Sequence, residues 1–192
     1  MASYNQFTSL PFIIYRIIMQ MVTNDNICKL LKYPEYDCLS KPNLTYDEKM
    51  AMIWKNPQFD RMENYNIFMT NTMANMMTDA ISMLQIYRYD SKPINYVIST
   101  ICYRLDFLFG SKTAMVEYEG IPCNRGDVFE MEIMKSLNGK DVAGVGFLQY
   151  NSGLSRLCGS NVSIGNNNTF TGVSIVFATQ ISDIGGGDND CS

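Results

Sequence analysis

Residues 120–150 constrain the fold of this chain most, because they carry the start and stop signals of a helix followed by a strand. Asn124 is a typical N-cap residue, since its side-chain oxygen can accept a hydrogen bond from a free N–H group of the first helical turn. Apolar residues then recur at three- and four-residue spacing, which gives one apolar face: Val128, Phe129, Ile133, Met134 and Leu137. Asn138 and Gly139 tolerate the left-handed conformation that ends a helix. The pattern predicts a helix over residues 127–137.

A strand over residues 142–150 is expected to follow this helix. Its apolar residues alternate between two faces, with Val142, Leu148 and Tyr150 on one and Ala143, Val145 and Phe147 on the other. That pattern is typical of a strand covered on both sides. Gly144 and Gly146 weaken the strand and indicate a bulge or a close backbone approach.

The clearest period-two alternation lies in residues 83–89 and 96–109, which are joined by the turn-rich residues 90–93. In the second segment the two faces differ, with Val97, Ile101, Tyr103, Leu105, Phe107 and Phe109 on one and Thr100, Arg104 and Asp106 on the other. This alternation predicts an antiparallel hairpin with one dry face. A closing strand is expected over residues 170–181.

Three short helices are expected before the hairpin. Residues 12–22 form an amphipathic helix with Ser9 as its N-cap candidate, and residues 26–31 form a second helix. The capping box of Thr45 and Glu48 predicts a third helix over residues 46–54. The first helix is too short for a membrane span, which takes about 20 residues. Residues 66–80 are expected to begin as a strand and to end as a short helix.

These elements predict an α+β fold, in which a mainly antiparallel sheet carries one main helix and is preceded by a helical N-terminal segment. We expect that helical segment at residues 1–65 and the α+β core at residues 66–184. Residues 185–192 are rich in Gly and Asp and have no apolar side chains to bury, so they are expected to form a disordered tail.

The composition argues against an enzyme. The chain of 192 residues has no histidine, which removes the usual general base and the commonest transition-metal ligand. The six cysteines form no CxxC pair and follow no signal peptide, so we expect reduced structural thiols rather than a zinc site or disulfides. We predict no catalytic, cofactor-binding or metal-binding residues.

Three short motifs have structural explanations. The Arg-Gly-Asp tripeptide at residues 125–127 spells an integrin ligand, but the same residues suit a helix N-terminus. Gly144 and Gly146 lie within an expected strand, so they do not predict a nucleotide-binding loop. A flexible tail would hold a cation only weakly through its acidic residues, Asp183, Asp188 and Asp190.

Two segments resemble the neck and tail-completion proteins of tailed bacteriophages, a group that includes tail-terminator-like and head-to-tail connector proteins. Residues 27–49, ICKLLKYPEYDCLSKPNLTYDEK, match a pattern of the type IxxLLxYxxxDxLSKPxLTxxEK. Residues 83–181 match a hairpin, a helix, an LNGK turn, a VxGVGxLxY-like strand and a closing strand. The chain departs from that pattern by insertions at residues 113–122 and 152–169.

The resemblance implies a non-enzymatic virion protein that is assembled in the host cytoplasm. It implies a ring of six or twelve copies that joins the head or portal to the tail. Neighbouring neck, portal or tail-tube proteins would be its partners, and DNA would pass through the ring without specific binding. The formal net charge of −4 fits this expectation, because gripping DNA by its phosphates requires a basic surface.

Two alternatives remain open at this stage. The first is an intracellular phage-encoded binding module with a small-molecule pocket. The second is a metal-dependent enzyme that uses carboxylates alone, which would require two or more buried carboxylates within metal-ligand reach.

Overall fold

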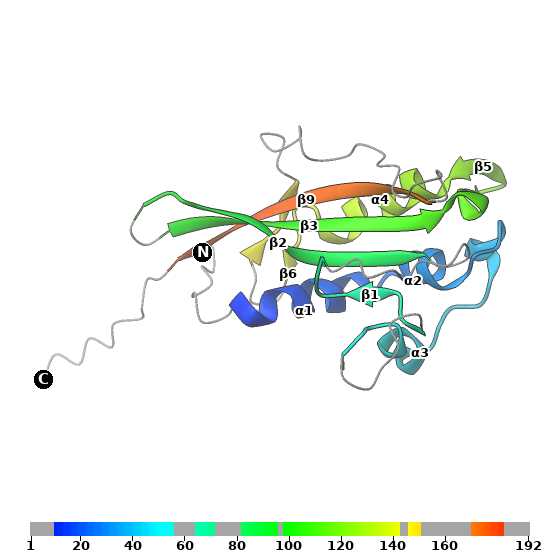
Figure 1. Ribbon diagram of the computed structural model, residues 1–192, viewed down its shortest axis with the longest axis horizontal. Coiled ribbons are helices and arrows are strands. Elements are labelled where there is room, and N and C mark those ends of the chain that lie inside the picture. Colours follow the sequence, from blue (N-terminus) through cyan, green and yellow to red (C-terminus); the bar gives the residue numbers. More distant parts are fainter. Residues whose placement is uncertain are drawn as a thin grey trace, which may run out of the picture.

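The computed structural model describes residues 10–55, 64–71, 82–95, 98–142, 146–150 and 170–182. The main sheet has five strands in the order β1-β2-β3-β9-β8, namely Ile67–Phe68 (β1), Met83–Pro93 (β2), Ile98–Gly110 (β3), Phe170–Ser182 (β9) and Gln149–Tyr150 (β8). β1 and β2 are parallel, and the other neighbouring strands are antiparallel. The long strands β2, β3 and β9 run along the longest axis of the molecule (Figure 1).

The predicted hairpin is confirmed, but it is longer than expected. β2 stays paired with β3 as far as Pro93, so residues 90–93 belong to the strand and not to the turn. A bulge between Arg88 and Asp90 shifts the register. In the described part of the chain β1 pairs with β2 only as far as Gln85, so the rest of β2 is a sheet edge. An edge strand tolerates proline, which has no N–H to donate.

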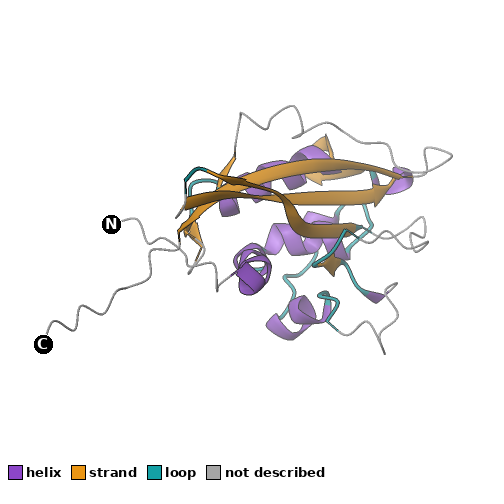
Figure 2. Cartoon of the chain, turned by 60° about the vertical axis from the view of Figure 1, so that its left-hand side comes forward, coloured by secondary structure: helices purple, strands orange, loops and turns teal. Residues whose placement is uncertain are grey.

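Three helices pack on one face of this sheet: Leu10–Met21 (α1), Asp25–Lys32 (α2) and Arg125–Leu137 (α4). Their apolar faces share one hydrophobic core with the inward side chains of β2, β3 and β9. Figures 1 and 2 show how the helices and the sheet are arranged. Phe129 of α4 is fully buried and stacks on Phe107 of β3, with 3.9 Å between ring centroids. The predicted α+β architecture, with a main helix on a mainly antiparallel sheet, is therefore confirmed.

The capping signals of α4 act as predicted. Asn124 Oδ1 accepts a hydrogen bond from the N–H of Gly126 at 2.8 Å. Gly139 has φ +67° just after the helix, which is the left-handed conformation expected there. The buried face contains Val128, Phe129, Ile133 and Leu137, and Met134 is partly buried against it.

The predicted N-terminal helices are also present. α1 buries four side chains in the core: Ile13, Ile17, Ile18 and Met21. The capping box of Thr45 and Glu48 starts Tyr46–Ala51 (α3), which ends earlier than predicted. Beyond α3 the chain bridges to β1, because Ile53 pairs with Ile67 and the N–H of Trp54 bonds to the Ile67 carbonyl. Two 3₁₀ helices, Cys38–Ser40 (η2) and Ser111–Thr113 (η4), complete the helical elements that are described.

The single strand predicted over residues 142–150 is wrong. Asp141–Val142 (β6) and Gly146–Phe147 (β7) pair antiparallel with each other, and only the next strand, β8, joins the main sheet. Gly146 has φ +81°, a conformation that suits a chain reversal and not a continuous strand. Phe147 is 51% exposed, whereas Val142 and Leu148 are buried in the core, so this segment is not covered on both sides.

A second hairpin precedes α4 and overlaps residues 113–122, which were expected to be an insertion. Met115–Tyr118 (β4) pairs antiparallel with Ile121–Asn124 (β5). Glu119 and Gly120 form the two-residue turn with φ +52° and +79°. Two positive φ values in succession are typical of a type I′ turn, which matches the twist of a β-hairpin.

Several predictions fall outside the described residues. They are the N-cap at Ser9, the helix within residues 66–80, the insertion at residues 152–169 and the tail at residues 185–192. The division into residues 1–65, 66–184 and 185–192 stays a prediction.

Candidate functional site

Polar side chains gather on the second face of the sheet around Asp106 of β3. Asp106 accepts hydrogen bonds from the Tyr87 hydroxyl at 2.8 Å and from Arg104 Nε at 2.7 Å. The Ser174 hydroxyl also donates to Asp106, and Arg104 Nη2 donates to Ser174 Oγ at 2.9 Å. Asp106 and Ser174 are buried. The network therefore joins β2, β3 and β9 by side-chain bonds, in addition to the backbone ladder.

Each side chain of this network has a hydrogen-bond partner within it, and two of the groups have shifted pKa values. Burial, reinforced by the hydrogen bond to Asp106, raises the pKa of Tyr87 to about 12. Burial works against the charge of Arg104, but its hydrogen bond to Asp106 prevails and raises its pKa. Ser174 donates to the Asp106 carboxylate and accepts from the Arg104 guanidinium, so both functions of its hydroxyl are used within the network.

The prediction of a hairpin with only one dry face is wrong. Arg104 and Asp106 lie on the second face as predicted, but the same face also buries Cys102, Leu108 and Val176. The sequence contained one sign that this second face is buried: the apolar residues Cys102 and Leu108 alternate in step with Arg104 and Asp106, so they lie on the same face. The partners of Asp106 on β2 and β9 depend on strand register, which the sequence does not reveal.

Arg125 is the largest fully buried side chain among the described residues, and it bonds to several backbone carbonyl groups. Its guanidinium donates to the carbonyls of Thr113, Leu30, Tyr33, Pro34 and Glu35 over distances of 2.6–3.1 Å. Burial lowers the pKa of Arg125. Leu30 and Tyr33 lie at the C-terminal end of α2, where the helix dipole favours a cation. Because Arg125 is inside, the Arg-Gly-Asp tripeptide is not displayed as an adhesion motif.

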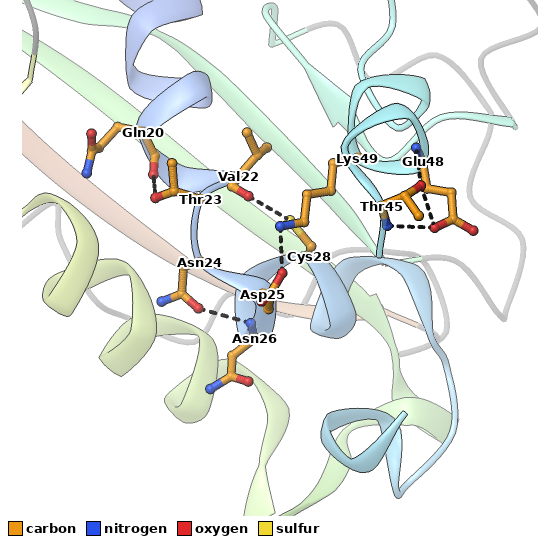
Figure 3. A network of polar contacts seen from close by, with 10 residues as sticks. All are labelled: Gln20, Val22, Thr23, Asn24, Asp25, Asn26, Cys28, Thr45, Glu48 and Lys49. Atoms are coloured by element: carbon orange, nitrogen blue, oxygen red, sulfur yellow. Dashed lines mark hydrogen bonds and ion pairs between the residues drawn. The ribbon is translucent and has the colours of Figure 1, made fainter. Parts of the chain in front are cut away.

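Hydrogen bonds and an ion pair connect the N-terminal helices to each other and to α4. Asn24 accepts from the N–H of Asn26 and caps α2, and Lys49 of α3 pairs with Asp25 at 2.5 Å (Figure 3). Asn24 Nδ2 also donates to the buried Glu132 of α4 at 2.8 Å. Burial would raise the pKa of Glu132, but its hydrogen bonds to Asn24 and Lys135 outweigh burial and lower it. These contacts are structural.

Two hollows of about 290 Å³ each open on the surface of the described residues. We name the first the α1 hollow, and its lining residues are Leu10, Pro11, Ile14, Arg88 and Tyr103. Tyr103 is buried, and its hydroxyl has no hydrogen-bond partner in the structure as described. The second hollow is more polar and is lined by Asn26, Leu39, Ser40, Glu117, Tyr118, Glu119 and Gly120.

Large apolar side chains are exposed toward both ends of the molecule. Ile94, at the end of the β2–β3 hairpin, is 54% exposed, and Ile121 and Met115 in the β4–β5 hairpin are 61% and 49% exposed. The β2–β3 hairpin extends to the left of Figure 1, and β5 lies at the right. Phe12 of α1, Tyr46 of α3 and Phe147 of β7 are exposed to a similar degree, so exposed apolar side chains are not confined to the two ends. Single exposed apolar residues are common on protein surfaces.

The described residues contain no group of His, Cys, Asp and Glu that could hold a metal ion. Asp183, Asp188 and Asp190 lie outside those residues, so a cation there is not tested. Gly146 lies in β7 with no helix directly after it, which does not form a nucleotide-binding loop. Among the helices that the structure describes, none is long and apolar enough to cross a membrane.

No curated protein and no solved structure is significantly similar to the chain. The model of one protein family, YomW, matches residues 24–179. The matched region begins at the loop before α2 and ends within β9, so it includes α4 and nearly all of the main sheet. The chain therefore belongs to the YomW family, a Bacillus phage-region protein family, and is a phage-associated protein.

Proposed function

We propose that this chain is a non-enzymatic structural protein of the phage particle, which forms a ring in the neck or at the tail end. The observation that carries the proposal is the exposure of apolar side chains on two hairpins, β2–β3 and β4–β5. These hairpins lie toward opposite ends of the long axis in Figure 1. Copies that meet through two different surfaces form heterologous contacts, which generate a closed ring when the rotation between copies closes.

The polar groups of the described residues support a structural role. The four side chains of the polar network form hydrogen bonds with one another: Asp106, Arg104, Tyr87 and Ser174. The guanidinium of Arg125 donates hydrogen bonds to backbone carbonyls. A catalytic site requires a group whose proton or electron pair is free to react, and neither cluster offers one.

The charge of the chain supports passage of DNA and not its capture. A formal net charge of −4 leaves no excess of cations to neutralise a run of phosphates. A channel lined by mildly acidic copies repels the phosphate backbone and lets DNA slide. The resemblance to neck and tail-completion proteins adds the expected partners, which are portal or tail-tube proteins, and a copy number of six or twelve.

A small-molecule binding module has less support. Each of the two hollows measures about 290 Å³. That volume is at the lower end of the range for ligand sites, roughly 300–1,000 Å³. In the α1 hollow only Arg88 and Tyr103 could orient a small ligand, and the second hollow is lined mainly by polar residues, whereas ligand sites are predominantly apolar.

The test uses purified particles of a phage that encodes this chain. Mass spectrometry should find the protein in the particles, and symmetry-averaged electron microscopy should place it as a ring on the axis between head and tail. Particles made without the chain should contain heads and tails that are not joined. Absence from wild-type particles, or a position on the capsid surface or tail fibres, would refute the proposal.

A further inference from the structure

The geometry points to a specific contact between copies of this chain, in which the tip of the β4–β5 hairpin of one copy enters the α1 hollow of the next. This inference rests on the proposed ring and names the surfaces that would build it. Its argument comes from the chemistry of the hollow, the chemistry of the tip and the positions of both in the fold.

The α1 hollow combines apolar walls with the positive charge of Arg88 and the hydroxyl donor of Tyr103. Leu10, Pro11 and Ile14 of α1 form the walls. Arg88 of β2 is exposed and has no carboxylate partner among the residues that are described. The Tyr103 hydroxyl is buried and lacks an acceptor in the same part of the chain. A buried donor without a partner is destabilising, so an incoming acceptor would be favoured there. The hollow thus suits an apolar side chain that is accompanied by a carboxylate.

The tip of the β4–β5 hairpin offers that combination. Ile121 is 61% exposed, and Glu119 in the turn beside it is also exposed. Across the described ranges, Glu119 has no cation within ion-pair distance. It is also the only described residue other than glycine with a positive φ, +52°. Type I′ turns favour Asn, Asp or Gly at such positions, so a glutamate here is not explained by turn chemistry. A contact made by its carboxylate would explain it.

The hollow and the tip lie too far apart to meet within one chain. α1 begins toward the left of Figure 1, and β5 is at the right end of the long axis. In the proposed contact, each copy would accept one neighbour's tip in its α1 hollow and would insert its own tip into the hollow of the other neighbour. Such contacts are heterologous, and a series of them forms a closed ring when the rotation between copies closes. Arg88 and Glu119 provide opposite charges across each contact, which fixes its register as well as its strength.

Charge reversal tests this contact. Self-association of the full chain is measured by sedimentation velocity over a wide concentration range, with circular dichroism to confirm folding. Arg88→Glu and Glu119→Arg should each weaken association by about tenfold or more, because each places like charges in contact. The double variant Arg88→Glu/Glu119→Arg should recover to within about threefold of wild type, because the pair is restored in the opposite sense.

Lys55→Glu provides the matched control. Lys55 is exposed after α3 and does not line the α1 hollow, so this variant should associate like wild type. The variant Lys55→Glu/Glu119→Arg has the same net charge as the double reversal but leaves the contact mismatched, so it should remain weak. Recovery that depends only on net charge would overturn the inference.

Other outcomes separate this contact from the ring itself. If Arg88→Glu associates like wild type, something other than a second copy's hairpin occupies the hollow, such as residues 1–9 or a small molecule, and the inference is wrong. A wild-type chain that stays monomeric at every concentration would also overturn it. In both cases a ring in purified particles would leave the proposed function intact, whereas absence from particles would remove it.

Discussion

The replacement Phe129→Ala tests the packing on which the fold depends. Phe129 is fully buried in α4, and its ring stacks on Phe107 with 3.9 Å between centroids and 11° between planes. Loss of the buried ring removes about 1.5–3 kcal/mol of transfer free energy. Loss of the stacked pair adds about 0.5–1.5 kcal/mol, and the cavity left between α4 and the sheet adds more. We expect the free energy of unfolding to fall by about 3–5 kcal/mol.

Chemical denaturation in urea measures this change, and Phe147→Ala serves as the matched control. Phe147 is 51% exposed in β7, so the same truncation should change the free energy of unfolding by about 0.5 kcal/mol or less. The slope of the unfolding free energy against urea should be similar in both variants, which shows that the same surface is exposed on unfolding. A cost of less than about 1 kcal/mol for Phe129→Ala would refute the assignment of the core face.

Three further predictions concern polar groups. Tyr103→Phe removes a buried hydroxyl that has no acceptor in the described structure. The free energy of unfolding in urea should therefore rise by about 1 kcal/mol for the isolated chain. A loss of stability would show that the hydroxyl is bonded. Arg125→Met leaves several buried carbonyls without a donor, so the free energy of unfolding should fall by more than about 3 kcal/mol. An unchanged free energy of unfolding would mean that the guanidinium bonds contribute little to stability. Folding raises the pKa of Tyr87 from 10.0 to about 12, so its protonated hydroxyl contributes stability that is fully present below pH 10 and is lost as the pH rises toward 12. The difference in unfolding free energy between wild type and Tyr87→Phe should shrink across that window, and a constant difference would contradict the assigned hydrogen bond to Asp106.

Local signals predicted the helices well, because the residues that cap a helix lie within a few positions of it. Asn124 and Gly139 bound α4, and the pair Thr45 and Glu48 starts α3. α3 nevertheless ends before the predicted residue Trp54, because the following backbone bonds to β1. That partner is distant in sequence, so local propensity could not reveal it.

Strand predictions succeeded where alternation was long and failed where it was short. The inward face of β3 extends from Ile101 to Phe109 and was identified from its period of two. The short apolar run from Val142 to Tyr150 suggested one strand, but the chain divides there into β6, β7 and β8. Positive φ at Gly146 is compatible with either a bulge or a reversal, and the pairing of β6 with β7 decides between them.

The polar groups were harder to place, because their meaning depends on contacts between distant segments. Asp106 is joined by Tyr87 and Ser174, which come from different strands. The alternation placed Asp106 on a polar face and did not predict that this face is buried. Arg125 belongs to a familiar surface tripeptide, and only the fold shows that its partners are carbonyls around residues 30–35.

The position of Arg125 also bears on how the proposed contact between copies could be strong. Its guanidinium bonds to the Thr113 carbonyl just before β4 and to the carbonyls of Leu30 and Pro34. The N–H of Glu117 in β4 bonds to the Tyr36 carbonyl at 2.8 Å, so the hairpin is fastened to the same segment. A tip held in this way loses little conformational entropy when it enters a neighbouring copy, and less of the contact energy is consumed by ordering it. In the proposed contact, Arg125 would act without touching a partner, because its bonds fix the direction in which the hairpin leaves the core.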